Sequence, residues 1–252
     1  MKVVAIIQAR MGSTRLPGKV LKDLFGKSVL NHVIDRVQNV KEIDQVVVAT
    51  TVLESDDPIV AEACKAGAGV YRGEEQDVLS RYYGAALDEK ADLVVRITSD
   101  CPLVDSKVVS EIITFHKQHN FDYVSNTLSR TFPRGLDVEI FTFEALQKAY
   151  EEGNHPEERE HVTPYIYHNP SLFSLYDYKH SEDLSNYRWT LDTLEDWKLI
   201  QSIYEHLYTP HQYFGLAETL ELIRKKPELS QINAHVEQKK LSYVKGIMGK
   251  IE

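Results

Sequence analysis

Residues Ile6–Lys19 read IIQARMGSTRLPGK, an apolar run that opens directly into a loop with two glycines. Gly12 and Gly18 allow a ligand to approach the backbone closely, or allow a positive φ angle. The same loop carries three cations: Arg10, Arg15 and Lys19. Glycines and cations in this combination predict polyphosphate binding. The loop is not a Walker A motif, because five residues rather than four separate the glycines, and it lacks the GxGxxG spacing of dinucleotide-binding folds.

The overall charge makes this local excess of cations distinctive. The 252 residues carry 29 Lys and Arg against 38 Asp and Glu, which gives a formal net charge of −9. We expect no general binding to nucleic acid or to a membrane surface, because such binders present a basic face. An anionic substrate must therefore be captured by a local site. The hydrophobic content of 42% is enough for one large α/β domain with an appendage.

The chain shows no pattern for export or membrane insertion. The apolar start is interrupted at Gln8 and Arg10, which makes it too short for a signal peptide. No segment approaches the roughly 20 apolar residues of a membrane span. Cys64 and Cys101 are the only cysteines, so neither a disulfide framework nor a zinc cluster is expected. We therefore expect a reduced, cytoplasmic protein.

Strand-like and helix-like segments alternate along the first 120 residues. Three β-branched runs are typical of strands buried on both faces: Val3–Ile7, Gln45–Ala49 and Leu93–Thr98. Periodicity and capping residues predict helices around 29–37, from Ser55 or Asp56 to Ala66, from Glu75 or Asp77 to Leu87, and over Val108–His119. The alternation predicts an α/β fold, a mainly parallel sheet flanked by helices, with its ligand site beyond the carboxyl ends of the strands.

The character of the sequence changes at about residue 121. Asp122–Ser125 and Asp137–Phe143 are predicted strands, and Leu172–Tyr178 alternates like a half-exposed strand. We predict a domain over 1–215, with a small α+β excursion from the main sheet at about 121–180, and a helical extension over 216–252. The extension ends in four lysines, which favour a solvated helix over an oligomer arm: Lys239, Lys240, Lys245 and Lys250.

Two acidic segments are candidates for metal binding. In RITSDCPLVD, residues 96–105, a predicted strand ends just before Asp100, and Mg²⁺ commonly uses only one or two carboxylates plus substrate phosphates. In RWTLDTLEDW, residues 188–197, Asp192 is interpreted as a second strand-end carboxylate and Asp196 as a structural residue. Each candidate has an alternative role at a helix N-terminus, Asp100 as the cap of the helix after Pro102 and Asp192 before the helix that follows it.

These motifs resemble a known family, the sugar-activating cytidylyltransferases, which include the CMP-sialic acid and CMP-Kdo synthetases. The family's first motif falls on Ala9, Arg10, Gly12, Ser13 and Lys19, and its Asp-x-Pro-Leu falls on Asp100, Pro102 and Leu103. From residue 1 to about 240 the chain is most similar to the branch called spore coat polysaccharide biosynthesis protein F. That similarity includes EEQDVLSRYY, PRGLDVEIF and PEEREHVTPYI.

The resemblance implies a Rossmann-like nucleotide-diphospho-sugar transferase fold. It also implies Mg²⁺-dependent transfer of a cytidylyl group from CTP to a small sugar, of the acidic nonulosonic type, in polysaccharide or glycan biosynthesis. The nucleotide contacts that it implies are Ala9, Arg10, Gly12, Ser13, Lys19 and Arg72. Asp100 and Asp192 would hold the metal, and Arg10, Lys19 and Asp100 would be catalytic. Dimerisation into a homodimer through the middle section is implied as well.

Three residues are expected on the acceptor side: Arg134, Asp137 and His161. Arg134 and Asp137 flank Gly135 in a motif of this branch, and a turn with strand-edge charges is the alternative interpretation. His161 ends a charged cluster that a solvated helix start also explains, with His155, Glu157, Arg159 and Glu160. Four aromatic residues are expected in the core or lining a groove rather than stacking on a base: Tyr82, Tyr83, Trp189 and Trp197.

The sequence also departs from the family. Gln8 stands where the sialic acid and Kdo enzymes usually have proline, and their sugar-contacting segments are not recognisable here, so the identity of the sugar does not carry over. Two other functions stay open. The first is a glycosyltransferase with a nucleotide-sugar donor, and the second is a non-catalytic nucleotide-binding protein of the same pathway. Release of pyrophosphate distinguishes cytidylyl transfer from both.

Overall fold

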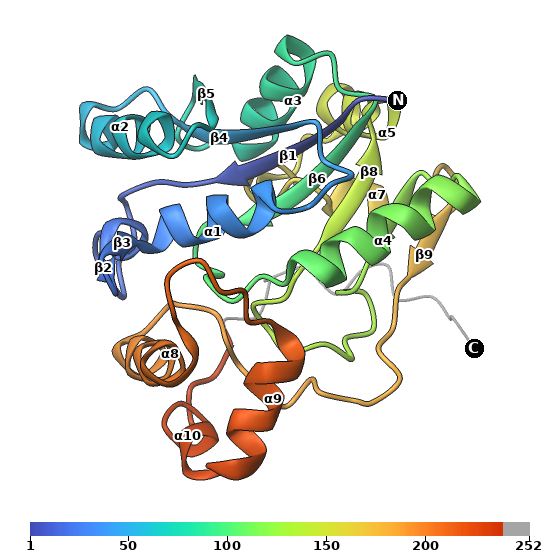
Figure 1. Ribbon diagram of the computed structural model, residues 1–252. Helices are drawn as coiled ribbons and strands as arrows, with labels where there is room; N and C mark the ends of the chain where they lie inside the picture. The colour runs from blue at the N-terminus through green and yellow to red at the C-terminus, as the bar shows by residue number, and fades with distance from the viewer. Residues whose placement is uncertain (239–252) are drawn as a thin grey trace.

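A seven-stranded sheet forms the centre of the protein in the computed structural model, which describes residues 1–238 (Figure 1). In spatial order the strands are β5 (Gly69–Gly73), β4 (Gln45–Thr51), β1 (Val3–Gln8), β6 (Leu93–Thr98), β8 (Glu139–Thr142), β7 (Tyr123–Ser125) and β9 (Leu175–Asp177). Only β8 runs antiparallel to its neighbours. The predicted α/β fold with a mainly parallel sheet is confirmed.

The central strand β1 is buried on both faces. Val3, Ala5 and Ile7 point into one hydrophobic core, while Val4 and Ile6 point into the other. Helices cover both faces of the sheet, so every position of the strand must be apolar, and the strand reads as a continuous rather than an alternating run. The pattern that predicted the strand is therefore a direct consequence of its place in the middle layer.

Helices form the two outer layers. They are α1 (Val29–Gln38), α2 (Asp57–Lys65), α3 (Val78–Asp88), α4 (Ser106–His119), α5 (Phe143–Glu152), α6 (Pro156–His161), α7 (Pro164–His168), α8 (Leu194–Leu207), α9 (Leu216–Lys225) and α10 (Glu228–Gln231). Two 3-10 turns, η1 (Lys19–Leu21) and η2 (Glu54–Asp56), join them. One core includes residues of α1, α2 and α4, and the other includes residues of α3, α5 and α7. The layers are visible in Figure 1.

Two helix starts bear on the site. The carboxylate of Asp77 accepts a hydrogen bond from the backbone N–H of Ser80 at 2.8 Å, so α3 begins where the sequence predicts it. The carboxylate of Asp105 accepts from the N–H groups of Lys107 at 2.7 Å and Val108 at 3.3 Å. The cap of α4 is therefore Asp105 rather than Asp100, which excludes the alternative role of Asp100.

The section at 121–180 contains helices and strands, as predicted, but its strands extend the main sheet instead of leaving it. β8 pairs with β6, and β7 then pairs with β8. The parallel half of the sheet would otherwise end in an unpaired edge at β6, whose backbone groups need partners. β9 is the outer strand on this side and is partly exposed, as the alternating pattern predicted.

The last helices pack against one another below the sheet in Figure 1, next to the carboxyl ends of the strands. The four lysines at the C-terminus lie outside the described residues. The sequence did not predict the small antiparallel hairpin of β2 (Asp23–Leu24) and β3 (Lys27–Ser28). Its two turn residues, Phe25 and Gly26, have φ angles of 56° and 84°.

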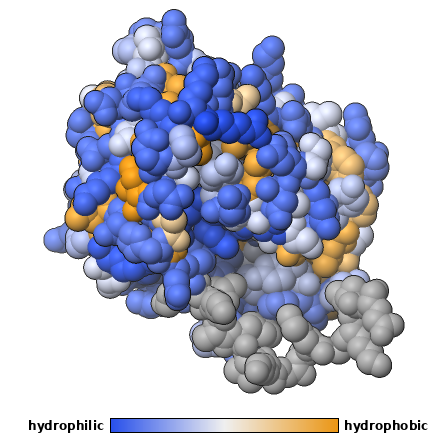
Figure 2. Space-filling view, turned by 90° about the horizontal axis from the view of Figure 1, so that it is seen from below, coloured by the Kyte–Doolittle hydropathy of each residue, from blue (hydrophilic) through white to orange (hydrophobic). Residues whose placement is uncertain are grey.

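The surface seen from below is mainly hydrophilic, with hydrophobic residues in small scattered groups (Figure 2). No helix within residues 1–238 is long and apolar enough to cross a membrane. Cys64 is exposed on α2 and Cys101 is buried beyond β6, and both thiols are free. This agrees with the expectation that the cysteines form no disulfide.

Gly135 is the glycine whose replacement should damage the fold near the site. Its φ angle is 106°, and a Cβ atom there would lie 2.5 Å from the carbonyl carbon of Trp189. We expect Gly135→Ala to lower the free energy of unfolding by roughly 1–2 kcal/mol for the backbone conformation, plus about 1–3 kcal/mol for the overlap. Urea unfolding followed by circular dichroism measures this.

Gly26→Ala is the matched control, because Gly26 also has a positive φ angle but has no atom within 4 Å of the added Cβ. The free energy of unfolding of this variant should fall only by the contribution of the backbone conformation. Equal losses in the two variants would show that the contact between Gly135 and Trp189 is unimportant.

Candidate active site

The loop that carries Arg10, Arg15 and Lys19, called the cation loop, follows the carboxyl end of β1. Two hydrogen bonds fix its first residues. The N–H of Ala9 donates to the carbonyl of Ala49 at 3.1 Å, and the N–H of Met11 donates to a carboxylate oxygen of Asp56 at 2.8 Å. Asp56 is buried and accepts a second bond from the hydroxyl of Thr51. The loop is thus tied to β4 and η2 on one side, which leaves its other side for a ligand.

Gly18 determines where Lys19 begins the turn η1. Its φ angle is 64°, the left-handed conformation that glycine adopts without a steric penalty. Gly12 has no positive φ angle, so its role is limited to the close approach that a missing side chain allows. Of the two glycines in the loop, only Gly18 is required by backbone conformation.

Lys19 lies at the centre of the site. Its Nζ atom is 2.7 Å from Oδ2 of Asp100 and 2.8 Å from Oδ1 of Asp192, and its side chain is only 12% exposed. Burial disfavours the ammonium charge, but the two carboxylates outweigh this effect and raise the pKa of Lys19 above its ordinary value. Lys19 is therefore charged at neutral pH and holds two carboxylates from distant segments together.

Asp192 is surrounded by cations. Besides Lys19, it contacts Nη2 of Arg15 at 3.2 Å and Nη2 of Arg188 at 3.0 Å. Burial raises the pKa of Asp192, but Lys19, followed by Arg15 and Arg188, outweighs burial and holds the pKa below its ordinary value. The carboxylate is thus ionised, with Oδ1 bound to Lys19 and Oδ2 bound to Arg15 and Arg188.

The position of Asp192 differs from the expectation that it ends a strand. It lies in a bend just before α8, after a single parallel bridge between Arg134 and Arg188. Thr193 is the N-cap of α8 and forms a capping box with Asp196, so Asp192 is not the cap. Asp196 is fully buried and accepts from Arg188 at 2.9 Å, in agreement with its predicted structural role.

A cleft of about 340 Å³ opens above these residues. Eight predicted site residues line it: Ala9, Arg10, Gly12, Ser13, Lys19, Asp100, His161 and Asp192. Nη1 of Arg10 lies 3.5 Å from Oε1 of Glu75, a residue next to the loop that does not line the cleft. The structure therefore brings the two metal candidates and all nucleotide candidates except Arg72 together with one acceptor candidate.

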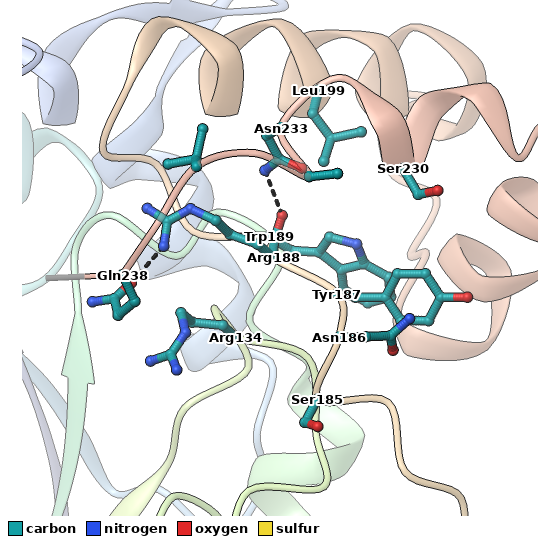
Figure 3. Close-up of a pocket in the computed structure, with 12 residues that line it drawn as sticks. Arg134, Ser185, Asn186, Tyr187, Arg188, Trp189, Leu199, Ser230, Asn233 and Gln238 are labelled. Carbon is teal, nitrogen blue, oxygen red and sulfur yellow. Dashed lines mark hydrogen bonds between the residues drawn. The ribbon is translucent and has the colours of Figure 1, made fainter. Parts of the chain in front are cut away.

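Three predicted site residues do not line this cleft. Arg72 lies on β5 and donates to the carbonyls of Thr51 and Leu53, which gives it a structural position. Asp137 is held by a bidentate ion pair with Arg130, with oxygen–nitrogen distances of 2.5 and 2.9 Å. Arg134 lines a neighbouring cavity (Figure 3).

The cleft also contains residues that the sequence analysis did not single out. Arg81 on α3 is buried at the edge of the cleft, and its Nη1 donates to the carbonyls of Glu74 and Glu75. Gln8 lines the cleft, and its Oε1 is buried without a hydrogen-bond partner among residues 1–238. Arg81 lies in the EEQDVLSRYY motif, whereas nothing in the sequence indicates that the Gln8 oxygen is unpartnered.

His161 enters the cleft from the end of α6. Burial lowers the pKa of its imidazole, and the neighbouring Glu160 only partly offsets this effect. The ring is therefore neutral at pH 7 and can accept a hydrogen bond or a proton. Cys101, next to Asp100, is the opposite case, because burial raises the pKa of its thiol and leaves no thiolate to act as a nucleophile.

The four aromatic residues predicted for the core or a groove do not line the cleft. Trp189 is 1% exposed and Trp197 is 8% exposed, so both belong to the core, as expected. The hydroxyl of buried Tyr82 lies 3.1 Å from the carbonyl oxygen of Ile6. Tyr83 stacks on Tyr150 at 4.3 Å between ring centroids, where α3 packs against α5.

Asp100 and Asp192 are the candidate ligands for a divalent cation. Their two carboxylate oxygens converge on one point, which Lys19 Nζ takes in this structure. Within residues 1–238 no group of three or more His, Cys, Asp or Glu side chains is arranged for a metal. Such a pair suits Mg²⁺, which completes its shell with substrate phosphates and water.

A mainly parallel α/β sheet with a cation loop and paired carboxylates at one edge defines a nucleotide-binding transferase. The chain matches the family model described as Cytidylyltransferase over residues 4–246, and it belongs to this family. It is an enzyme of the nucleotidyltransferase class. The resemblance identified from the motifs is confirmed. The family is one of cytidylyltransferases, which are neither glycosyltransferases nor non-catalytic proteins.

Three known proteins illustrate the relationship. A cytidylyltransferase from Leptospira borgpetersenii serovar Hardjo-bovis has a solved structure with a TM-score of 0.86 and 38% identity, covering 92% of this chain and 97% of that one. Spore coat polysaccharide biosynthesis protein SpsF of Bacillus subtilis is 34% identical over 218 residues, 81% of this chain and 86% of that protein. CMP:2-keto-3-deoxy-manno-octonic acid synthetase, solved with CTP, is 17% identical with a TM-score of 0.62 and shares the fold, over 82% of this chain and 100% of that one.

The ion pairs of Asp192 should make stability depend on pH. Because the pKa of Asp192 is lower in the folded protein than its ordinary value of 3.8, its contribution is complete above pH 3.8 and is lost as the pH falls through the folded value. We expect Asp192→Asn to lower the free energy of unfolding by about 1–3 kcal/mol at pH 7. This difference should shrink as the pH falls below 3.8 toward the lower pKa of the folded protein, because protonation makes the wild-type carboxyl neutral as well.

Urea unfolding at pH 7, 5, 4 and 3 measures this difference. Asp88→Asn, at an exposed position on α3, is the control and should match the wild type throughout. A loss in Asp192→Asn that stays constant between pH 7 and pH 3 would refute the electrostatic explanation.

Proposed function

We propose that the protein transfers a cytidylyl group from CTP to a sugar, with Mg²⁺, and releases pyrophosphate. The observation that carries this proposal is that Asp100 and Asp192 both contact Lys19. The loop that ends at Lys19 also brings Arg10 and Arg15 to the same cleft. Two carboxylates for a divalent cation and a set of cations for phosphates are the groups that phosphoryl and nucleotidyl transfer require.

The residues of the chain act mainly by positioning and by charge. Arg10, Arg15 and Lys19 bind the triphosphate, and Lys19 stabilises the negative charge that develops on the leaving pyrophosphate. Mg²⁺ held by Asp100 and Asp192 would supply further neutralisation of the phosphate oxygens. His161, neutral at pH 7, accepts a hydrogen bond or the proton of the attacking sugar hydroxyl.

Two observations support a polyhydroxylated acceptor. The orphaned Oε1 of Gln8 and the ring of His161 both border the cleft and can accept hydrogen bonds from hydroxyl groups. The relatives include a protein of spore coat polysaccharide biosynthesis and, over 116 residues, a 3-deoxy-manno-octulosonate cytidylyltransferase, which supports an acidic sugar. That this sugar is of the nonulosonic type stays a prediction from the sequence. The homodimer and the cytoplasmic location stay predictions from the sequence.

Pyrophosphate release tests this function. We expect release that depends on Mg²⁺ and on CTP, and not on ATP, GTP or UTP, when a panel of nonulosonic and related acidic sugars is supplied. Asp100→Asn should reduce turnover at least about a hundredfold, because one of the two carboxylates for the metal is lost. Asp88→Asn, an exposed change of the same chemistry, should keep wild-type turnover.

A coupled phosphate assay with added pyrophosphatase follows the reaction. Turnover that survives in Asp100→Asn would overturn the metal assignment. Nucleotide binding without pyrophosphate release for every sugar in the panel would count against cytidylyl transfer to this class of acceptor.

A further inference from the structure

A second cavity, of about 150 Å³, lies next to the cleft (Figure 3). Arg188 lines this cavity and Asp192 lines the cleft, and the ion pair between them joins the two spaces. The walls come from the loop before α8, from Arg134, and from the segment that follows α10. Most of the side chains that face it are polar.

Arg188 uses its guanidinium in two different ways. Nε and Nη2 are bound to Asp196, and Nη2 also binds Asp192, so this side is neutralised by carboxylates. Nη1 donates instead to Oε1 of Gln238, as Figure 3 shows. A neutral amide oxygen thus takes a guanidinium N–H group that could bind a carboxylate oxygen more strongly, as a charge-assisted hydrogen bond.

Arg134 faces the same cavity and has no counter-ion. Its backbone is fixed, with its N–H 3.0 Å from the carbonyl of Tyr187, but its side chain makes no hydrogen bond or ion pair with any of residues 1–238. The acid closest in sequence, Asp137, is already bound by Arg130 at both oxygens. Burial, followed by the charge of Arg130, lowers the pKa of Arg134, and the more distant charges of Asp137 and Asp192 only partly offset this effect.

The charges around the two spaces do not balance. The two spaces are lined by six cations, Arg10, Arg15, Lys19, Arg81, Arg134 and Arg188, whereas Asp100, Glu160 and Asp192, with Asp196 behind them, supply four negative charges. On the cavity side, Arg134 is a cation that no carboxylate contacts among residues 1–238. A bound anion at this place would be neutralised by a half-buried guanidinium whose backbone is already fixed.

We propose that Arg134 and Arg188 bind a carboxylate of the acceptor, in the position that the carboxamide of Gln238 occupies in this structure. A carboxamide is planar and has nearly the same shape as a carboxylate, so the contact with Gln238 indicates that a carboxylate fits. That the carboxylate belongs to the acceptor rests on the proposed function. The site then explains how an acidic sugar is oriented: its carboxylate lies beyond Asp192, and its hydroxyl points into the cleft.

Substitutions at Gln238 test this assignment in opposite directions. Gln238→Ala removes the internal occupant and should strengthen the binding of an external carboxylate. Gln238→Glu supplies a tethered carboxylate and should weaken that binding about tenfold, as should Arg134→Gln. Gln231→Ala and Gln231→Glu, at an exposed position at the end of α10, are the matched controls and should bind like the wild type.

The probe is pyruvate, with pyruvamide as its neutral counterpart, and the readout is the fluorescence of Trp189, which lines the cavity. We expect saturable binding of pyruvate alone, with the order of affinity Gln238→Ala, then wild type, then the two weakened variants. A purely structural role of Gln238 predicts loss of binding in both Gln238 variants and would refute the proposal. Binding of inorganic phosphate in preference to pyruvate would also refute it.

A competition experiment locates the anion. Because the cavity lies beyond Asp192, pyruvate should bind equally well with and without CTP, whereas displacement by CTP would place the anion in the triphosphate site and overturn the assignment. Neither titration requires turnover. If no sugar supports pyrophosphate release but the affinity order holds, the carboxylate site stands and the proposed reaction fails. If release occurs while all variants bind pyruvate alike, the proposed reaction stands and the carboxylate site fails.

Discussion

The ammonium of Lys19 is the point at which the rest of the site is held together. Its two partners are 81 and 173 residues away along the chain. A largely buried ammonium needs paired carboxylates to offset its lost hydration, and two carboxylates that face each other need a cation between them. The three groups therefore specify one another, and each segment that carries one of them is fixed by bonds of its own.

Two of these segments are placed by the sheet alone. β1 and β6 are adjacent and parallel, so the loop after β1 and the turn after β6 leave the same edge side by side. Asp192 has no such strand and reaches this edge by a longer route. The Arg134–Arg188 bridge, the capping box of α8 and the pair of Arg188 with Asp196 fix its position, and Gly135 is the residue that lets the two backbones approach.

Most of the fold could be predicted from the sequence, because a strand that is buried on both faces of the sheet is apolar at nearly every position. The continuous apolar runs of β1, β4 and β6 marked the central strands, and Asp77 marked the start of α3. The middle section was harder, because short strands such as β7 carry no signal for the sheet that they will join. Pairing is a long-range property, and three residues do not specify it.

The site was predicted less completely, since several roles depend on competition between neighbours. Asp105 rather than Asp100 caps α4, although both acids precede the helix, and only the structure shows which N–H groups each one faces. Asp137 belongs to Arg130 and leaves Arg134 alone, which the spacing in PRGLDVEIF does not reveal. Spacing identifies the chemical types in a site, whereas the ion pairs are settled by three-dimensional distance.

The different surroundings of the two cysteines have a practical consequence. Cys101 is enclosed beside Asp100 with its pKa raised by burial, while Cys64 stands exposed on α2 and does not line the cleft. A thiol-reactive dye or spin label would therefore attach to the natural sequence at a single position. A label on Cys64 would allow the association of subunits or the binding of a ligand to be followed by spectroscopy, and Cys101 would not have to be replaced first.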